Sequence, residues 1–273
     1  MTRSIRDTAA LLDAVEGPFG NEPRTVVAPT IPFSDTVART LSKGTLKIEG
    51  RPLRVGLCLT HFAGLKVDPE VEAAVRNVAS LLESMGAEVT EAAPALDYQM
   101  IVEADMMCAG AFMTTALKHI AHAEGIELDY SKFSSDVTAM ITTANNASAV
   151  DLFEGLEGYN EVRRQVYNYF GDYDLMVAPV IACQSQKAAL FELDNPNGTE
   201  EDWAHHYSYL VPFNISGNPA MSVPAAMSST NMPIGVQLVA PFGRDDTVLA
   251  AGALLEQAIG WQDVIAPLHS SRL

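Results

Sequence analysis

Residues 212–243 read PFNISGNPAMSVPAAMSSTNMPIGVQLVAPFG, and this stretch constrains the fold more than any other part of the chain. Asparagine, glycine and proline occur near its start, and two apolar runs follow, over 220–226 and 234–240. Small polar residues at 228–231 separate the two runs. Short apolar runs bounded by turn-forming residues are typical of strands joined by a tight connection. The stretch therefore predicts a β-hairpin.

The second apolar run places different side chains on the two faces of a sheet. Because strand side chains alternate, Ile234, Val236 and Leu238 share one face, whereas Gln237 lies on the other. An amide in such an apolar run needs hydrogen-bond partners if it is buried. On its residues alone, the stretch is a structural hairpin with one satisfied amide.

Composition and charge limit the partners that the chain could bind. Its 273 residues are 48% hydrophobic and 19% charged, as in a globular protein with one large core or two smaller domains. There are 17 lysines and arginines against 34 aspartates and glutamates, which gives a net charge of −17. Nucleic acids and anionic membranes are bound by clustered basic residues. We therefore expect no nucleic-acid partner and no membrane partner, while a homo-oligomer is compatible with the sequence.

The cysteines and the N-terminal residues indicate a cellular setting. Cys58, Cys108 and Cys183 are far apart and form neither a C-x-x-C pair nor a zinc spacing, which favours a reducing, cytoplasmic environment. The first residues carry charges and lack the apolar core of a signal peptide. The longest uncharged helical run, 106–117, is expected to be too short to span a bilayer.

The middle of the chain alternates strands and helices. Apolar runs predict strands at 53–59 and 88–92, and a helix with proline in its first turn is predicted between them at 68–85. Such a strand–helix–strand unit places its strands parallel. A third buried strand is predicted at 175–181.

Helical spacing of apolar residues predicts the other elements. In the long helix at 98–124, the section 106–113 has no polar face, so we expect this helix to be buried all round. Composition predicts an extended surface segment at 18–50 and a polar loop at 184–202. The remaining helices are predicted at 4–16, 129–144, 150–170, 203–210 and 248–259.

Residue spacing alone reveals no catalytic set, metal centre or organic cofactor. The G-x-S-x-G, S-x-x-K, H-E-x-x-H, P-loop and G-x-G-x-x-G motifs are missing from the sequence. His119 and His122 stand at i and i+3, but no further ligand has a matching spacing. The adjacent His205 and His206 point apart on a helix. We therefore expect no metal site.

Cys108 lies in the Met-rich section of the long helix. Buried cysteines mostly act as small hydrophobic residues. A nucleophilic thiolate would need a base or a positive charge nearby, and Lys118 and His119 are the nearest such residues in the sequence. We favour the packing role and keep the nucleophile as an alternative.

Five segments match one known pattern in the right order. The start, MTRSIRDTAALLDAVEGP, places Arg3, Ser4 and Asp7 in the pattern G-P-M-x-R-S-x-x-D. The other segments are LRVGLCL, DPEVEAAVRNVASLLESMGAEVTE, YDLMVAPVIA and FNISGNPAMSVPAAMSSTNMPIGVQLVAPFGRDDTVLAAGALLEQ. Together they resemble the C-terminal half of the amidase signature family of amide hydrolases. Asn231 departs from the family's usual glycine, but asparagine tolerates a left-handed turn, so the hairpin can survive.

The resemblance implies an α/β fold, the C-terminal portion of the amidase signature fold, with a mixed β-sheet flanked by helices. Residues 1–273 would then be a single partial amidase domain. Family members use a serine nucleophile, a second serine and a lysine, with a backbone oxyanion hole. In the family these residues precede the matched segments, so no catalytic residue is assigned here. The six lysines without a matching motif are Lys43, Lys47, Lys66, Lys118, Lys132 and Lys187.

We therefore expect the chain to be a C-terminal piece of a longer amidase, or one part of a split enzyme, and to be inactive alone. Its substrate would be a small-molecule amide, bound once an N-terminal half completes the site. By resemblance, this half supplies one wall of the acyl-binding pocket, to which we assign Cys108, Val180 and Ile181. The position of Cys108 is similar to that in amidases of small lactam-like or linear amides, such as the 6-aminohexanoate cyclic-dimer hydrolases.

Two alternatives stay open. The chain could be a non-catalytic binding or scaffold domain derived from the amidase fold, or the A subunit of a tRNA-dependent amidotransferase. A role linked to tRNA favours a basic surface, which the net charge of −17 does not support.

Overall fold

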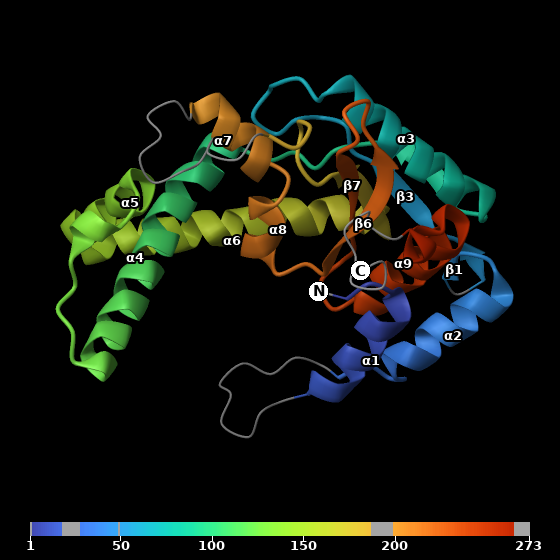
Figure 1. Cartoon of the computed structure of the whole chain (residues 1–273), viewed down its shortest axis with the longest axis horizontal. Helices are drawn as coiled ribbons and strands as arrows, with labels where there is room; N and C mark the ends of the chain where they lie inside the picture. Colours follow the sequence, from blue (N-terminus) through green and yellow to red (C-terminus); the bar gives the residue numbers. More distant parts are fainter. Residues whose placement is uncertain (1, 18–27, 49, 187–198, 265–273) are drawn as a thin grey trace, which may run out of the picture.

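The computed structural model describes residues 2–17, 28–48, 50–186 and 199–264. In this part a mixed five-stranded sheet runs in the order β4-β3-β5-β7-β6, with helices on both faces (Figure 1). This confirms the predicted α/β class. The main elements are α1 (Ile5–Val15), α2 (Phe33–Lys43), β1 (Lys47–Ile48), β2 (Arg51–Pro52), β3 (Arg54–Leu57), α3 (Pro69–Ser84), β4 (Glu88–Glu91), α4 (Tyr98–Glu124), α5 (Ser135–Asn146), α6 (Ala149–Asp172), β5 (Leu175–Pro179), α7 (Glu200–Tyr207), α8 (Val211–Ser216), β6 (Ala220–Met227), β7 (Pro233–Val239) and α9 (Asp245–Ile259).

Residues 212–243 contain the predicted hairpin, in which β6 and β7 pair antiparallel. Ile234, Val236 and Leu238 are buried together in one core, as the alternation predicted. Gln237 is 4% exposed, and its amide donates a hydrogen bond to the carbonyl oxygen of Tyr209 at 2.9 Å. The prediction of one buried, satisfied amide is therefore confirmed.

The hairpin turn depends on Asn231. Its φ of 60° lies in the left-handed region, where the amide donates to the carbonyl oxygen of Ser228 at 2.9 Å. Ser228 in turn donates its amide to the carbonyl oxygen of Met232 at 2.8 Å. The expectation that asparagine can replace glycine at this turn is confirmed.

We expect Asn231→Ala to lower the free energy of unfolding by about 1 kcal/mol, because a left-handed conformation costs about that much for an ordinary residue. Asn231→Gly is the matched control and should be at least as stable as the original chain, because glycine adopts this φ freely. The thermal unfolding midpoints of the three chains measure this. Equal midpoints for the alanine and glycine variants would contradict the assigned role of the turn.

The other half of the sheet is parallel. β3 pairs parallel with β4, as the strand–helix–strand unit predicted, and it also pairs parallel with β5. The carboxylate of Asp68 caps α3 by accepting the amide of Glu70 at 2.8 Å, and Pro69 stands in the first turn. β5 then pairs antiparallel with β7, which joins the parallel half to the hairpin.

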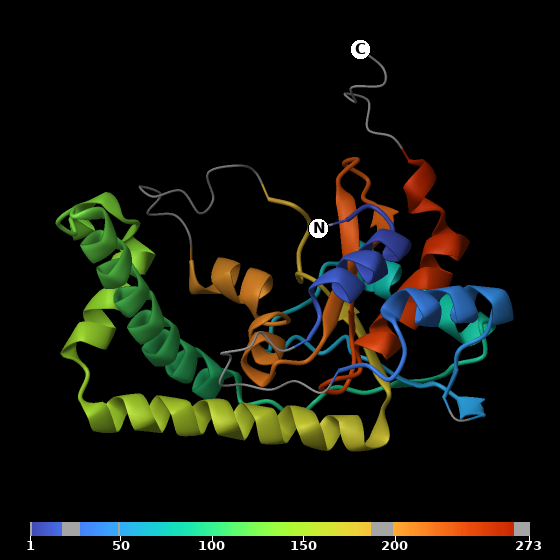
Figure 2. The same ribbon diagram turned by 90° about the horizontal axis from the view of Figure 1, so that it is seen from below.

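The sheet separates two cores. On one face, residues of β3, β5 and β7 pack with α3 and α9, whereas on the other face Met176, Ala178 and Val239 pack with α6 and α8. α1 and α2 pack on the outside of α9. Figure 2 shows α6 running beneath the sheet and α4 and α5 extending beyond it at the far end of α6.

The predicted extended segment at 18–50 is wrong over 33–43, where α2 forms, and its part at 18–27 lies outside the described residues. Phe33, Val37 and Leu41 recur at every fourth residue and pack in the core between α2 and α9. The start of α2 has no cap from its own side chains. Instead, the carboxylate of Asp13 in α1 accepts the amides of Phe33 and Ser34 at 2.6 and 3.0 Å. The composition of the segment around α2 could not predict this cap, because the carboxylate comes from another helix.

α7 begins earlier than predicted, at Glu200, because Thr199 and Asp202 form a reciprocal capping box at its start. Within the predicted polar loop at 184–202, residues 187–198 lie outside the described residues. α5 begins at Ser135, six residues after the predicted start at 129, since a 3₁₀ turn at Tyr130–Lys132 comes first.

The expectation that α4 is buried all round is wrong. Ile101 and Cys108 are buried, but Phe112 is 78% exposed, because α5 and α6 cover only part of the helix in the described structure. The uncharged run 106–117 lies inside this longer helix. By length and composition, the 27 residues of α4 could cross a membrane, and 28% of its most apolar window is buried. Core helices of soluble proteins pass the same test, so this carries little weight.

Candidate functional site

The segment after β5 lies where the carboxyl ends of β3 and β5 meet. It is held from both sides at Ala182. The carbonyl oxygen of Ala182 accepts the amide of Asp68 at 2.8 Å, and its amide donates to the carbonyl oxygen of His205 at 2.8 Å. The start of α3 and the end of α7 therefore converge on this segment. The carboxyl ends of parallel strands are where α/β proteins usually bind ligands.

Val180 and Ile181, two of the predicted substrate-binding residues, lie in this segment. Both are half-buried, so part of each side chain remains accessible. Val180 packs against the backbone of β7, because a Cβ added to Gly235 would stand 3.2 Å from its Cγ2. The arrangement is compatible with a pocket wall, and their contact with substrate stays a prediction.

Cys108, the third predicted residue, packs separately, between α4 and α6. The helices approach closely there. A Cβ added to Gly155 would lie 3.1 Å from the sulfur of Cys108, and a Cβ added to Gly158 would lie 2.8 Å from the Cβ of Ala104. Burial, and then the nearby Asp105, raise the pKa of the Cys108 thiol. The thiol is therefore protonated and packs closely against Gly155. This favours a packing role for Cys108 over a role as nucleophile.

A half-buried tyrosine on α6 stands near Cys108. Tyr159 donates its hydroxyl to the carboxylate of Asp105 on α4 at 2.7 Å, and the guanidinium of Arg163 lies 5.9 Å from the ring centre. Burial and this hydrogen bond raise the pKa of Tyr159, so its hydroxyl is protonated at neutral pH. The pair fixes α4 against α6 and does not supply a base.

Histidine and tyrosine side chains lie close together beside the segment after β5. The sequence analysis did not predict this cluster. The ring of His61, in the loop after β3, meets those of His205 and Tyr209 at centroid distances of 5.1 and 5.7 Å. His61 Nδ1 accepts the amide of Ala63 at 3.2 Å, so its proton is on Nε2. Burial, together with His205, lowers the pKa of His61 to about 4, which keeps it neutral at pH 7.

Three buried polar atoms in this region have no hydrogen-bond partner among the described residues. They are His61 Nε2, His205 Nδ1 and Ser208 Oγ. Such atoms are costly unless water or a ligand satisfies them. All three atoms belong to the loop after β3 or to α7 and its C-terminal end.

His206 points away from His205, as predicted, and toward Cys183. The sulfur of Cys183 lies 3.8 Å from His206 Nε2, and His206 Nδ1 lies 2.7 Å from the carbonyl oxygen of Asp202. Sequence reasoning used Cys183 only as an indicator of compartment. The available signal was its position, two residues beyond the predicted end of a buried strand. Within the described ranges, no group of three or more His, Cys, Asp or Glu residues is arranged to hold a metal.

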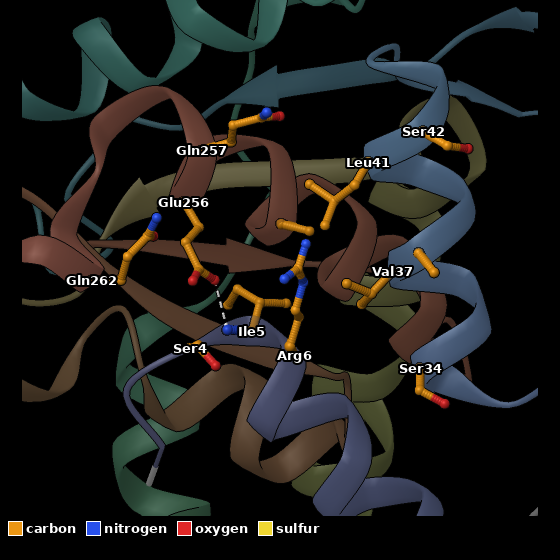
Figure 3. Close-up of a pocket in the computed structure, with 12 residues that line it drawn as sticks. Ser4, Ile5, Arg6, Ser34, Val37, Leu41, Ser42, Glu256, Gln257 and Gln262 are labelled. Atoms are coloured by element: carbon orange, nitrogen blue, oxygen red, sulfur yellow. Dashed lines mark hydrogen bonds between the residues drawn. The ribbon is translucent and has the colours of Figure 1, made fainter.

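A cavity of about 870 Å³ lies elsewhere, between α1, α2 and α9 (Figure 3). Val37 and Leu41 give it an apolar wall, and Arg6 and Glu256 bring opposite charges to its lining (Figure 3). Glu256 accepts the amide of Ile5 at 2.6 Å, which fixes the start of α1 on α9. The cavity contains none of the predicted site residues.

Comparison with known proteins gives a consistent match along the chain. Residues 1–249 match the family model described as Amidase. The 6-aminohexanoate-cyclic-dimer hydrolase of Pseudomonas sp. (strain NK87) is 30% identical over 272 residues, which cover 95% of this chain and 53% of that protein. The acylamidase of Rhodococcus erythropolis is 27% identical over 96% of this chain and 52% of its own length.

Solved structures agree. A 6-aminohexanoate cyclic dimer hydrolase superposes with a TM-score of 0.85 at 25% identity, covering 98% of this chain and 56% of that one. A bacterial aryl acylamidase superposes with a TM-score of 0.78 at 21% identity, covering 96% and 53%, and this likeness concerns the fold alone. The chain spans about half the length of the curated relatives that it matches.

Proposed function

The chain belongs to the amidase family, and from that premise we propose that it is the C-terminal part of an enzyme that hydrolyses carbon–nitrogen bonds of small-molecule amides. The observation that carries the proposal is a family match along residues 1–249 in a chain that covers 53% of its 6-aminohexanoate-cyclic-dimer hydrolase relative. We infer that the other part of the enzyme supplies the catalytic serines and lysine.

The exposure of the lysines supports the proposal that the catalytic lysine belongs to the other part of the enzyme. A lysine that acts as a base must lose its proton, which requires a buried or positively charged environment. The five lysines in the described residues are all exposed: Lys43, Lys47, Lys66, Lys118 and Lys132. Lys118 bonds to Asn145 and Lys132 pairs with Asp129, so neither is directed at a serine hydroxyl.

Exposed apolar side chains support the need for a covering part. Phe112 on α4 and Phe153 on α6 are 78% and 69% exposed, and Val150 on α6 is 65% exposed. Large apolar side chains grouped on neighbouring helices usually mark a surface that contacts protein. We propose that the completing part of the enzyme covers them.

The proposal predicts that the purified 273-residue chain does not hydrolyse simple amides. A chimera in which the uncovered N-terminal half of the Pseudomonas relative precedes residue 1 should hydrolyse them, as measured by release of amine. The relative's half alone is the control and should be inactive. Serine-dependent hydrolysis by the 273-residue chain alone would overturn the division. An inactive but folded chimera would favour the scaffold alternative.

The same chimera tests the pocket residues. Ile181→Ala should change KM or kcat by about tenfold if the side chain forms part of the acyl wall, because a buried aliphatic contact contributes about 1–3 kcal/mol to discrimination. Val180→Ala is expected to act in the same direction. Cys108→Ala should leave both constants within about twofold if its role is to pack against Gly155.

A further inference from the structure

We propose that Cys183 and His206 form a thiol–imidazole dyad, which makes Cys183 a covalent modification site for soft carbon electrophiles such as α-haloacetamides. The imidazole Nε2 lies 3.8 Å from the sulfur, within reach of a hydrogen bond to sulfur. The inference does not depend on the proposed amidase function, and it concerns residues outside the predicted pocket wall.

The tautomer of His206 suits it to act as a base. Its Nδ1 lies 2.7 Å from the carbonyl oxygen of Asp202, which can only accept, so Nδ1 carries the proton. Nε2 then presents its lone pair to the thiol. A nucleophile, a base and a group that orients the base are the elements of an activated nucleophile. The backbone of α7 fixes this orientation, because Asp202 and His206 are one helical turn apart.

The surroundings keep Cys183 as a thiol until it reacts. Burial raises its pKa, and the carboxylates of Asp68 at the start of α3 and Asp202 on α7 add to this effect, whereas a hydrogen bond from the Gln186 side chain opposes it. The proton must therefore leave during the reaction. It passes from sulfur to His206 Nε2 as the sulfur attacks carbon, the carbon–halogen bond breaks, and halide departs.

The other two cysteines provide internal controls. Cys58 is fully buried, and burial raises its pKa to about 12. Cys108 is 9% exposed and faces Gly155. Cys183 is half-buried and is thus both accessible and beside a base.

Alkylation of the native chain by limiting iodoacetamide, followed by peptide mass mapping, tests the dyad. Cys183 should react at least about tenfold faster than Cys58 and Cys108. His206→Asn should slow the reaction of Cys183 about tenfold or more, whereas His205→Asn, its neighbour that points away, should change it by less than about twofold. An equal rate at all three cysteines, or an unchanged rate in His206→Asn, would overturn the proposal.

Two readouts separate activation from a loss of structure. If His206→Asn merely loosened the fold, the buried Cys58 would become reactive, which the same peptide map detects. The pH profile of the unaltered chain needs no variant. General-base assistance predicts that the Cys183 rate reaches a plateau well below the pH at which the thiol itself titrates, because burial raises the pKa of the thiol. A rate that follows only the thiol titration would contradict the dyad.

Discussion

Replacing Gly56 by alanine is expected to lower the free energy of unfolding by about 3 kcal/mol. Gly56 lies in β3 and faces α6, where an added Cβ would overlap the hydroxyl of Tyr169 and stand 2.9 Å from its Cζ. The ring cannot turn aside, because it stacks on Tyr173 at a centroid distance of 4.9 Å and meets Phe170 edge-on at 5.2 Å. The strand or the helix must therefore shift, which disturbs the core on that face.

Gly171→Ala is the matched control. Gly171 lies in the last turn of α6, and an added Cβ would have no neighbour within 4 Å, so this variant should be as stable as the original chain or more stable. The double variant Gly56→Ala, Tyr169→Phe removes the overlapping oxygen and should recover more than about 1 kcal/mol. Urea unfolding of the four chains measures these differences. No recovery in the double variant would show that the hydroxyl of Tyr169 is not the cause.

Much of the sheet could be predicted because its signals are local. The hairpin of β6 and β7, the parallel pairing of β3 and β4, and the cap of Asp68 on α3 follow from residues close in sequence. The misses arise from tertiary contacts. α2 is capped by a carboxylate from α1, and the section 106–113 of α4 has no polar face although helices cover only part of it in the described structure.

The candidate site was predictable only in part. The end of a buried strand located Val180 and Ile181, but His206 is 23 residues from Cys183 in the sequence and meets it only because α7 folds back over the end of β5. The loop after β3 brings His61 to His205, but its sequence has no periodic pattern from which this contact could be predicted. Family resemblance supplied the expected chemistry, because residue spacing alone revealed no catalytic set.

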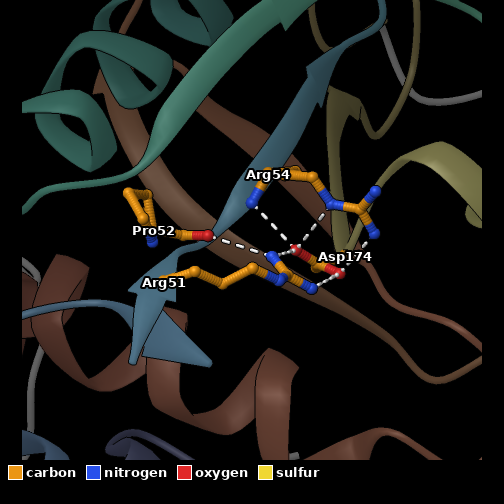
Figure 4. Close-up of polar contacts among 4 residues, drawn as sticks. All are labelled: Arg51, Pro52, Arg54 and Asp174. Atoms are coloured by element: carbon orange, nitrogen blue, oxygen red, sulfur yellow. Dashed lines mark hydrogen bonds and ion pairs between the residues drawn. The ribbon is translucent and has the colours of Figure 1, made fainter. Parts of the chain in front are cut away.

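Asp174→Asn is expected to lower the free energy of unfolding by about 2 kcal/mol at pH 7. Asp174 precedes β5, and its carboxylate accepts from both Arg51 and Arg54 side chains at 2.6–3.3 Å and from the Arg54 amide at 2.9 Å (Figure 4). Its side chain is 11% exposed, whereas those of the two arginines are about 40% exposed, at 42% and 39%. Water can therefore solvate the arginines after the loss, which keeps the cost below that of a fully buried pair.

The pH dependence distinguishes the charge of Asp174 from its shape. Burial works to raise the pKa of this carboxyl, but the hydrogen bonds from Arg51 and Arg54 outweigh it and hold the pKa well below its ordinary value. A group with a lowered pKa stabilises the fold fully above its unfolded pKa, about 4, and loses that contribution as the pH falls further. The difference between the original chain and Asp174→Asn should therefore be constant from pH 8 to about pH 5 and shrink below about pH 4. The exposed Asp172→Asn is the matched control and should change stability by less than about 0.5 kcal/mol. A difference that persists undiminished at pH 3 would mean that packing, and not the ion pair, holds the starts of β3 and β5 together.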